Sequence, residues 1–145
     1  METKKDFYNS LNKNILEIKS TDSYIGSHKT NCIGTALYLV GEKFKDEHVE
    51  DETEIIFNKF VESANPEIGY LVGWINKRNK IYHAAVIVKT NPLLVANRDG
   101  IGVPFYSHEK FNEINSMHTE SHENFKEIKY FIPSKLQKIL EMEAQ

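Results

Sequence analysis

A single cysteine, Cys32, stands where a polar loop becomes an apolar run. It lies in the segment KTNCIGTALYLVG, residues 29–41, and the 145-residue chain has no other cysteine. Thr30 or Asn31 is a suitable N-cap for a helix that continues through Val40. A thiol in the first turn of a helix gains thiolate character because the positive end of the helix dipole stabilises the anion. Cys32 is therefore a candidate nucleophile, although a lone cysteine is also common as a small buried hydrophobe.

The expected helix start offers a second contribution to such chemistry. Its first backbone N–H groups have no partner within the helix and can stabilise an oxyanion that forms on an attacked carbonyl. The small residues Gly34, Thr35 and Ala36 follow Cys32 and would let the helix pack closely against a sheet. Nucleophile and oxyanion donors are thus expected in one helical turn.

The best candidate for a base is His83. A thiolate nucleophile needs a base within hydrogen-bond reach, and the other five histidines lie in polar or charged sequence. His83 opens the apolar segment HAAVIV, whose alanines leave room for a neighbouring element. A strand would hold the imidazole rigidly at the edge of a cleft. A core histidine satisfied by backbone partners is the alternative, and the sequence leaves both open.

The imidazole in turn needs an orienting acceptor, which strand alternation predicts. If residues 83–97 form a hairpin with a three-residue loop at Lys89–Asn91, His83 lies opposite Asn97 and the two side chains share a face. Asp99 has the same parity one step further along, whereas Arg98 points to the other side.

An even-numbered hairpin loop would break this arrangement. Asn97 is the preferred orienter and Asp99 the reserve. A plain turn at NRDG, residues 97–100, is the alternative to any functional role for these residues.

The elements that must position these side chains follow a simple order. Apolar residues recur at helical spacing over residues 4–19, and helical spacing resumes in TEIIFNKFVES, residues 53–63. Strand-like segments rich in β-branched and aromatic residues come next, at residues 67–75, 81–89, 93–99 and 125–133. Residues 1–145 are expected to form one α+β domain with an antiparallel sheet, from a helical part at about 4–63, a strand-rich part at about 67–132 and a C-terminal helix at about 134–144.

Composition argues against several partner classes. The net charge is −3 and the basic residues are scattered, so nucleic acid is not an expected partner. No apolar run approaches the roughly 20 residues of a membrane span, and the N-terminus lacks the apolar segment of a secretory signal, so a cytoplasmic protein is expected. No cofactor fingerprint is present. His118 and His122 have a spacing that can hold a metal on a helix, but HTESH is expected to be a polar surface segment without a metal.

The order of these candidates resembles papain-like cysteine peptidases, most closely the NlpC-type branch of bacterial cell-wall endopeptidases and amidases. The matching segments are YIG, NCIGTALYLVG, PEIGYLVGW, YHAAVIV and VANRDG, which together span about residues 24–100. The resemblance implies a papain-like core with Cys32 as nucleophile, His83 as general base and Asn97 as orienter. Tyr24 and Asn31 would lie on the oxyanion or substrate side.

The sequence departs from that family at several positions. Asn31 replaces the aspartate that precedes the family's cysteine, Ile33 replaces the following serine, and Gly69-Tyr70 replaces a Gly-Asp step. The expected function is a cysteine-dependent hydrolase of an amide or related acyl bond, such as a peptidase, amidase or deamidase. A non-catalytic protein-binding module on the same fold and an acyltransferase are the alternatives.

Overall fold

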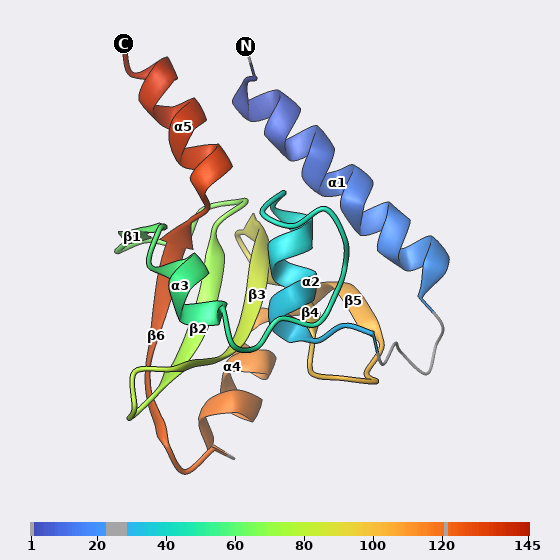
Figure 1. Cartoon of the computed structure of the whole chain (residues 1–145), viewed down its shortest axis with the longest axis vertical. Coiled ribbons are helices and arrows are strands. Elements are labelled where there is room, and N and C mark those ends of the chain that lie inside the picture. Colours follow the sequence, from blue (N-terminus) through green and yellow to red (C-terminus); the bar gives the residue numbers. More distant parts are fainter. Residues whose placement is uncertain (1, 23–28, 121) are drawn as a thin grey trace.

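The protein is a six-stranded antiparallel sheet with helices on both faces, seen in a computed structural model that describes residues 2–22, 29–120 and 122–145 (Figure 1). The strand order is β1-β6-β2-β3-β4-β5. The strands are β1 (Val61–Ser63), β2 (Leu71–Asn76), β3 (Ile81–Thr90), β4 (Leu93–Arg98), β5 (Phe105–Lys110) and β6 (Phe125–Ile132). The helices are α1 (Lys4–Thr21), α2 (Cys32–Leu39), α3 (Thr53–Phe57), α4 (Phe111–Glu120) and α5 (Ser134–Glu143). The predicted α+β class with an antiparallel sheet is confirmed.

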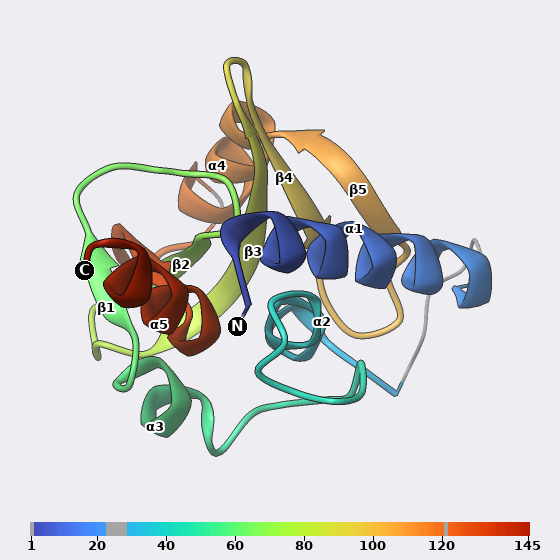
Figure 2. The ribbon, with the colours of Figure 1, turned by 90° about the horizontal axis from the view of Figure 1, so that it is seen from above.

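Alternation along the strands divides the buried residues between two faces of the sheet. Ala84 and Val86 of β3 join the larger cluster, which also contains the apolar faces of α1, α2 and α5. Ala85 and Ile87 join the smaller cluster, beneath α4. Figure 2 shows the same division, with α1, α2 and α5 on one side of β3 and α4 on the other. Odd and even residues of β3 therefore belong to different environments.

Helix α1 forms where the sequence predicts it. Thr3 caps it, and Asp6 bonds back to the Thr3 backbone N–H, which completes a capping box. The residues at helical spacing are all buried, namely Phe7, Leu11, Ile15 and Ile18. Local capping and burial of the apolar stripe thus agree.

Residues 53–63 differ from the single helical segment that their spacing predicts. Helix α3 ends at Phe57, and Val61–Ser63 instead forms strand β1 against β6. Phe57 and Phe60 still pack together, with ring centroids 5.1 Å apart. Pairing with the edge of the sheet overrides the helical pattern here because it satisfies backbone groups that an extra helical turn would have satisfied locally.

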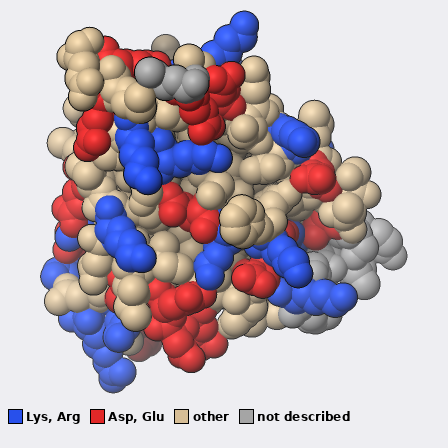
Figure 3. Space-filling view, turned by 45° about the horizontal axis from the view of Figure 1, so that its top comes forward, with Lys and Arg blue, Asp and Glu red and all other residues tan. Residues whose placement is uncertain are grey.

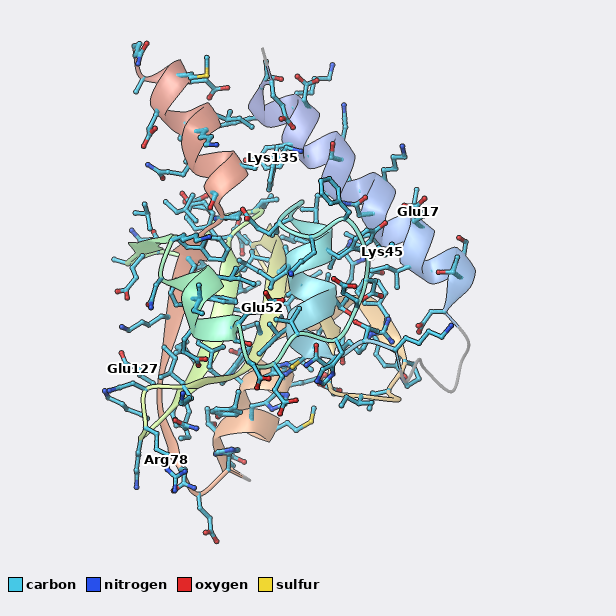
Figure 4. All side chains as sticks on the ribbon, in the orientation of Figure 1. Glu17, Lys45, Glu52, Arg78, Glu127 and Lys135 are labelled. Carbon is cyan, nitrogen blue, oxygen red and sulfur yellow. The ribbon has the colours of Figure 1, made fainter. Side chains whose placement is uncertain are left out.

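Charges of both signs are interspersed on the face shown in Figure 3. Figure 4 shows three of the charged side chains: Glu17 on α1, Arg78 at the β2–β3 turn and Lys135 on α5.

Among the described residues, no helix combines the length and the apolar character that crossing a bilayer requires.

Candidate active site

Asn31 fixes the start of α2. Its Oδ1 accepts hydrogen bonds from the backbone N–H of Gly34 at 2.8 Å and of Val49 at 3.2 Å, and its Nδ2 donates to the Val49 carbonyl at 2.8 Å. Asn31 is thus the N-cap, one of the two residues that the sequence predicts for that position. Because the amide is engaged on both sides, Asn31 ties α2 to the following loop and places Cys32 in the first helical turn.

Close backbone packing holds the same turn from outside. A Cβ atom built on Gly34 would lie 1.6 Å from the Glu47 carbonyl oxygen. Only glycine permits this approach, since any side chain would occupy the space of a backbone atom. The loop after α2 therefore presses directly against the turn that carries Cys32.

The Cys32 sulfur lies against the backbone of β3. Its Sγ is 3.8 Å from the Tyr82 carbonyl oxygen, and the N–H of Ala84 also points toward it. These two groups flank His83 in the chain. The sulfur thus contacts the strand at the position of the predicted base.

Burial controls the acidity of this thiol. Cys32 is 7% exposed, and burial raises the pKa of its thiol to about 11. The backbone N–H groups of Ala84, Ile33 and Cys32 itself act in the opposite direction but do not compensate. The resting thiol is therefore protonated at neutral pH, unlike the acidic thiol expected from the helix end, because loss of hydration outweighs the partial charges of the helix terminus.

His83 lies on the α4 side of the sheet. Its ring centroid is 4.9 Å from that of Trp74 and 3.7 Å from that of His118. Its Nε2 is 2.7 Å from the Oδ1 of Asn97. Burial, followed by the neighbouring His118, lowers the pKa of His83 to about 3, against the raising effect of the Asn97 hydrogen bond. The imidazole is therefore neutral at physiological pH.

The orientation of Asn97 determines the tautomer of His83. The Nδ2 of Asn97 donates to Asp99 Oδ1 at 2.7 Å and to Glu109 Oε1 at 3.0 Å. The pKa of Asp99 is lowered, first by its hydrogen bond from His118, so this carboxylate is an ionised acceptor. The amide must turn its NH₂ group toward it and its Oδ1 toward His83. His83 Nε2 is then the protonated nitrogen, and Nδ1 carries the free lone pair.

That free nitrogen is buried and unpaired. Within residues 2–22, 29–120 and 122–145, His83 Nδ1 has no hydrogen-bond partner. Buried polar atoms nearly always have one, so such an atom calls for an explanation. The network from Asp99 through Asn97 leaves His83 with one basic nitrogen, Nδ1, available to accept a proton.

The β3–β4 hairpin brings His83 and Asn97 to one face by a different route from the predicted one. The loop is Asn91-Pro92, two residues long, and not the three-residue Lys89–Asn91 loop on which the predicted pairing was conditional. A register shift at Val88 inserts one extra residue into β3. This bulge restores the parity that an even loop would have broken. The loop is thus even-numbered, the alternative that the sequence left open, and the conditional proximity of His83 to Asn97 is nevertheless observed.

Arg98 points to the opposite face of β4, as the alternation predicts. Its side chain is fully buried and forms ion pairs with Asp22 at 3.0 Å and with Asp46 at 3.3 Å. Its Nε donates to the Thr35 hydroxyl at 2.9 Å, and its Nη1 donates to the Val103 carbonyl at 2.7 Å. Thr35 belongs to α2, so Arg98 connects β4 to the helix that carries Cys32.

His118 joins the site although it is not among the predicted site residues. It lies on α4, and its side chain is only 15% exposed, whereas HTESH is predicted to be a polar surface segment. Its Nε2 is 3.4 Å from Asp99 Oδ1. Phe111 and Ile114 are buried with i, i+3 spacing on the same helix, and His118 continues that stripe at i+7. This periodicity is the signal that could have found it.

Three of these residues have ligand atoms close enough to suggest a metal centre. Within the described parts of the chain, atoms of His83, Asp99 and His118 lie within 4.8 Å of one another. However, the two imidazole planes are inclined by only 19°. A metal lies close to the plane of each imidazole that binds it, about 2.0–2.1 Å from the nitrogen. Two stacked rings cannot both direct a lone pair at one ion, so this arrangement fits a hydrogen-bonded network better than a metal site.

The predicted site residues thus fall into two groups. His83, Asn97 and Asp99 form one hydrogen-bonded chain, whereas Cys32 contacts the β3 backbone beside His83. Among the described side chains, no hydrogen bond joins the sulfur to the imidazole. Tyr24 lies outside the described residues.

The chain matches no protein-family model, no curated protein and no solved structure.

Proposed function

We propose that this protein is a cysteine-dependent hydrolase of amide or related acyl bonds, with a papain-like arrangement of Cys32, His83 and Asn97. The observation that carries the proposal is the buried Nδ1 of His83, which has no hydrogen-bond partner in the part of the chain that the structure describes. An unsatisfied buried polar atom costs about 1–3 kcal/mol. Asp99 and Asn97 impose that cost by fixing the tautomer, and a base that must accept a proton explains it.

Position supports Cys32 as the nucleophile. Its sulfur contacts the two peptide groups that flank His83, and it lies in the first turn of a capped helix. The helix α2 packs on the opposite face of β3 from the His83 ring, so Sγ and Nδ1 must approach each other past the β3 backbone for the proton to move. Catalytic hydrogen bonds are often long in unliganded enzymes and shorten when substrate binds.

The reaction follows from these roles. The Cys32 sulfur attacks the substrate carbonyl, and His83 Nδ1 takes the thiol proton as the S–C bond forms. The backbone N–H groups at the start of α2 stabilise the oxyanion. His83 then gives the proton to the leaving amine as the C–N bond breaks. Water, deprotonated by His83, then attacks the thioester carbonyl. The C–S bond breaks, the acid is released, and His83 returns its proton to the Cys32 sulfur.

The resting protonation state has a kinetic consequence. Because the thiol is protonated and the imidazole neutral, the proton must move as the sulfur attacks. The reaction therefore depends on His83 as a general base and does not begin from a preformed thiolate–imidazolium pair. Transfer of the acyl group to an amine instead of water would use the same first step.

The test is alkylation of Cys32 by iodoacetamide, which is unambiguous because the chain has one cysteine. We expect native protein to be labelled at pH 7 and His83→Ala to be labelled about 10²-fold more slowly, as for loss of a positioned base. His108→Ala is the matched control, because His108 lies on β5 and is exposed. Asn97→Ala should slow labelling more than Asp99→Ala, since Asn97 contacts the imidazole directly.

A second readout tests acyl transfer itself. Incubation with p-nitrophenyl acetate should release nitrophenol and add one acetyl group to Cys32, detected by mass spectrometry. Labelling that requires urea, together with no acetylation, would overturn the proposal and favour a binding module. Equal labelling of the wild type and His83→Ala would remove His83 from the mechanism.

A further inference from the structure

We infer that His118 is a positioning residue of this site. Asp99 holds His118 in place, and His118 accepts a proton in preference to His83, so that His83 remains available as a base. This inference rests on the proposed function. Four side chains form a closed loop. His83 donates to Asn97, Asn97 donates to Asp99, and His118 pairs with Asp99 while its ring stacks on His83.

The two imidazoles have different electrostatic partners. His118 Nε2 faces the ionised carboxylate of Asp99 at 3.4 Å. His83 Nε2 faces the neutral amide oxygen of Asn97, and the His83 residue is 1% exposed. A cation is stabilised by a carboxylate and by access to water. Both conditions favour a proton on His118 over one on His83.

The stack disfavours charge on both rings at once. Their centroids are 3.7 Å apart, and two like charges at that separation repel strongly away from water. Burial is the main reason that the pKa of His83 is lowered, and the positive charge of the neighbouring His118 is the second reason. A proton on His118 therefore opposes a second proton on His83.

The remaining groups around His118 fix its place. The Tyr82 hydroxyl donates to the His118 backbone carbonyl at 2.7 Å. The ring centroids of Trp74 and His118 are 5.5 Å apart. Glu109 of β5 is a further acidic group nearby: burial raises the pKa of its carboxyl, and His118 acts weakly in the opposite direction. In the described ranges, the charged and titratable groups of other elements near His118 are His83 and Tyr82 of β3, Asp99 after β4, and Glu109 of β5.

The expected consequence is a base that survives mild acid. As the pH falls, the Asp99–His118 pair takes up a proton first, and His83 keeps its Nε2–H, Nδ1 lone-pair tautomer. Among the described residues, the other aromatic ring that contacts His83 is the uncharged indole of Trp74, so His118 is the neighbouring ring that can carry a positive charge.

The experiment is a ¹⁵N NMR titration of the imidazoles in the full chain from pH 8 to pH 2.5, because the pKa of His83 is lowered to about 3, with circular dichroism at each pH to show that the chain is folded. In the wild type, the His83 signals should remain those of the neutral tautomer until the pH is well below the point at which the His118 signals change. His118→Phe retains an aromatic ring without charge, and His118→Gln retains an amide toward Asp99. In both, the titration midpoint of His83 should rise by about one pH unit. His108→Gln is the control and should leave the midpoint unchanged.

The outcomes separate this inference from the proposed function. Titration of His83 before His118 in the wild type, or an unchanged His83 midpoint in both variants, would overturn the inference, and the wild-type result decides even if a variant fails to fold. In folded variants, the acid limb of Cys32 alkylation should move upward with the His83 midpoint. Absence of native alkylation would instead defeat the hydrolase proposal, while the order of protonation would still be decided by NMR.

Discussion

Two adjacent residues of β4 belong to networks of opposite character. Arg98 lies on the α2 face, and each of its three guanidinium nitrogens has a partner. Asn97 lies on the α4 face and bonds His83, whose Nδ1 is left without a partner among the described residues. A closed network of compensated charges serves to fix structure, whereas a network that leaves one buried lone pair free keeps a group available for chemistry.

The two networks are also mechanically related. Arg98 contacts Thr35 and so positions the helix that carries Cys32, while Asn97 positions His83 on β3. One short strand therefore sets both sides of the proposed nucleophile–base pair. Disturbing the Arg98 face should act mainly on stability, and disturbing the Asn97 face mainly on protonation.

The largest expected effect is on the Arg98 face. Arg98→Met would leave the carboxylates of Asp22 and Asp46 without their buried cation, so the free energy of unfolding should fall by about 3–5 kcal/mol. Urea unfolding followed by circular dichroism measures it. Arg78→Met is the matched control, because Arg78 is exposed at the β2–β3 turn and should change stability by less than about 0.5 kcal/mol. Similar losses for both variants would contradict a structural role for the Arg98 network.

A smaller effect is expected where α2 meets the loop. Gly34→Ala forces the new methyl group onto the Glu47 carbonyl, so α2 or the loop must shift, at about 1–3 kcal/mol of unfolding free energy. Gly100→Ala is the matched control, since the nearest atom to its added Cβ is 4.0 Å away. The same urea titration compares them. An unchanged Gly34→Ala protein would show that the position of Cys32 is not fixed by this contact.

The smallest effect concerns pH and the Asn97 face. His83 binds a proton near pH 6.5 when unfolded but only near pH 3 when folded, so the unfolded state binds more protons between these values. The free energy of unfolding should therefore fall as the pH drops below about 6.5. At pH 5.5 it should be about 1.4 kcal/mol lower than at high pH, where His83 is neutral in both states. Urea unfolding at pH 7.0 and 5.5 measures this loss. His83→Gln should reduce it and His108→Gln should not; equal pH dependence in all three proteins would contradict a buried neutral imidazole.

Local patterns in the sequence were sufficient for much of the site. Helical spacing located α1, the cap residue located the start of α2, and strand alternation assigned Asn97 and Arg98 to opposite faces. These predictions depend on short-range geometry, in which side-chain direction follows from position in a helix or strand.

Other features depend on contacts between distant segments. The bulge at Val88 could not be foreseen, because a register shift is chosen by the packing of both strand faces. Val61–Ser63 became a strand only because β6 offers an edge for pairing. Glu109 and His118 joined the site because β5 and α4 fold back over β4 and β3.

The acidity of the thiol shows the same limit in electrostatic terms. A cysteine at a helix start predicts a lowered pKa, but the tertiary structure buries Cys32 and raises it. Burial depends on every element that packs around the sulfur, and β3, which contacts it, lies about 50 residues further along the chain.

The amino-acid sequence by itself determined the class of the fold, the helix start at Cys32 and the strand that carries His83, because periodicity and capping are local properties of the chain. Tertiary structure alone decided which nitrogen of His83 is free, which ring stacks upon it and how acidic the thiol is. Those properties arise from desolvation and from charges brought together across long stretches of sequence, so they exist only once the sheet has assembled.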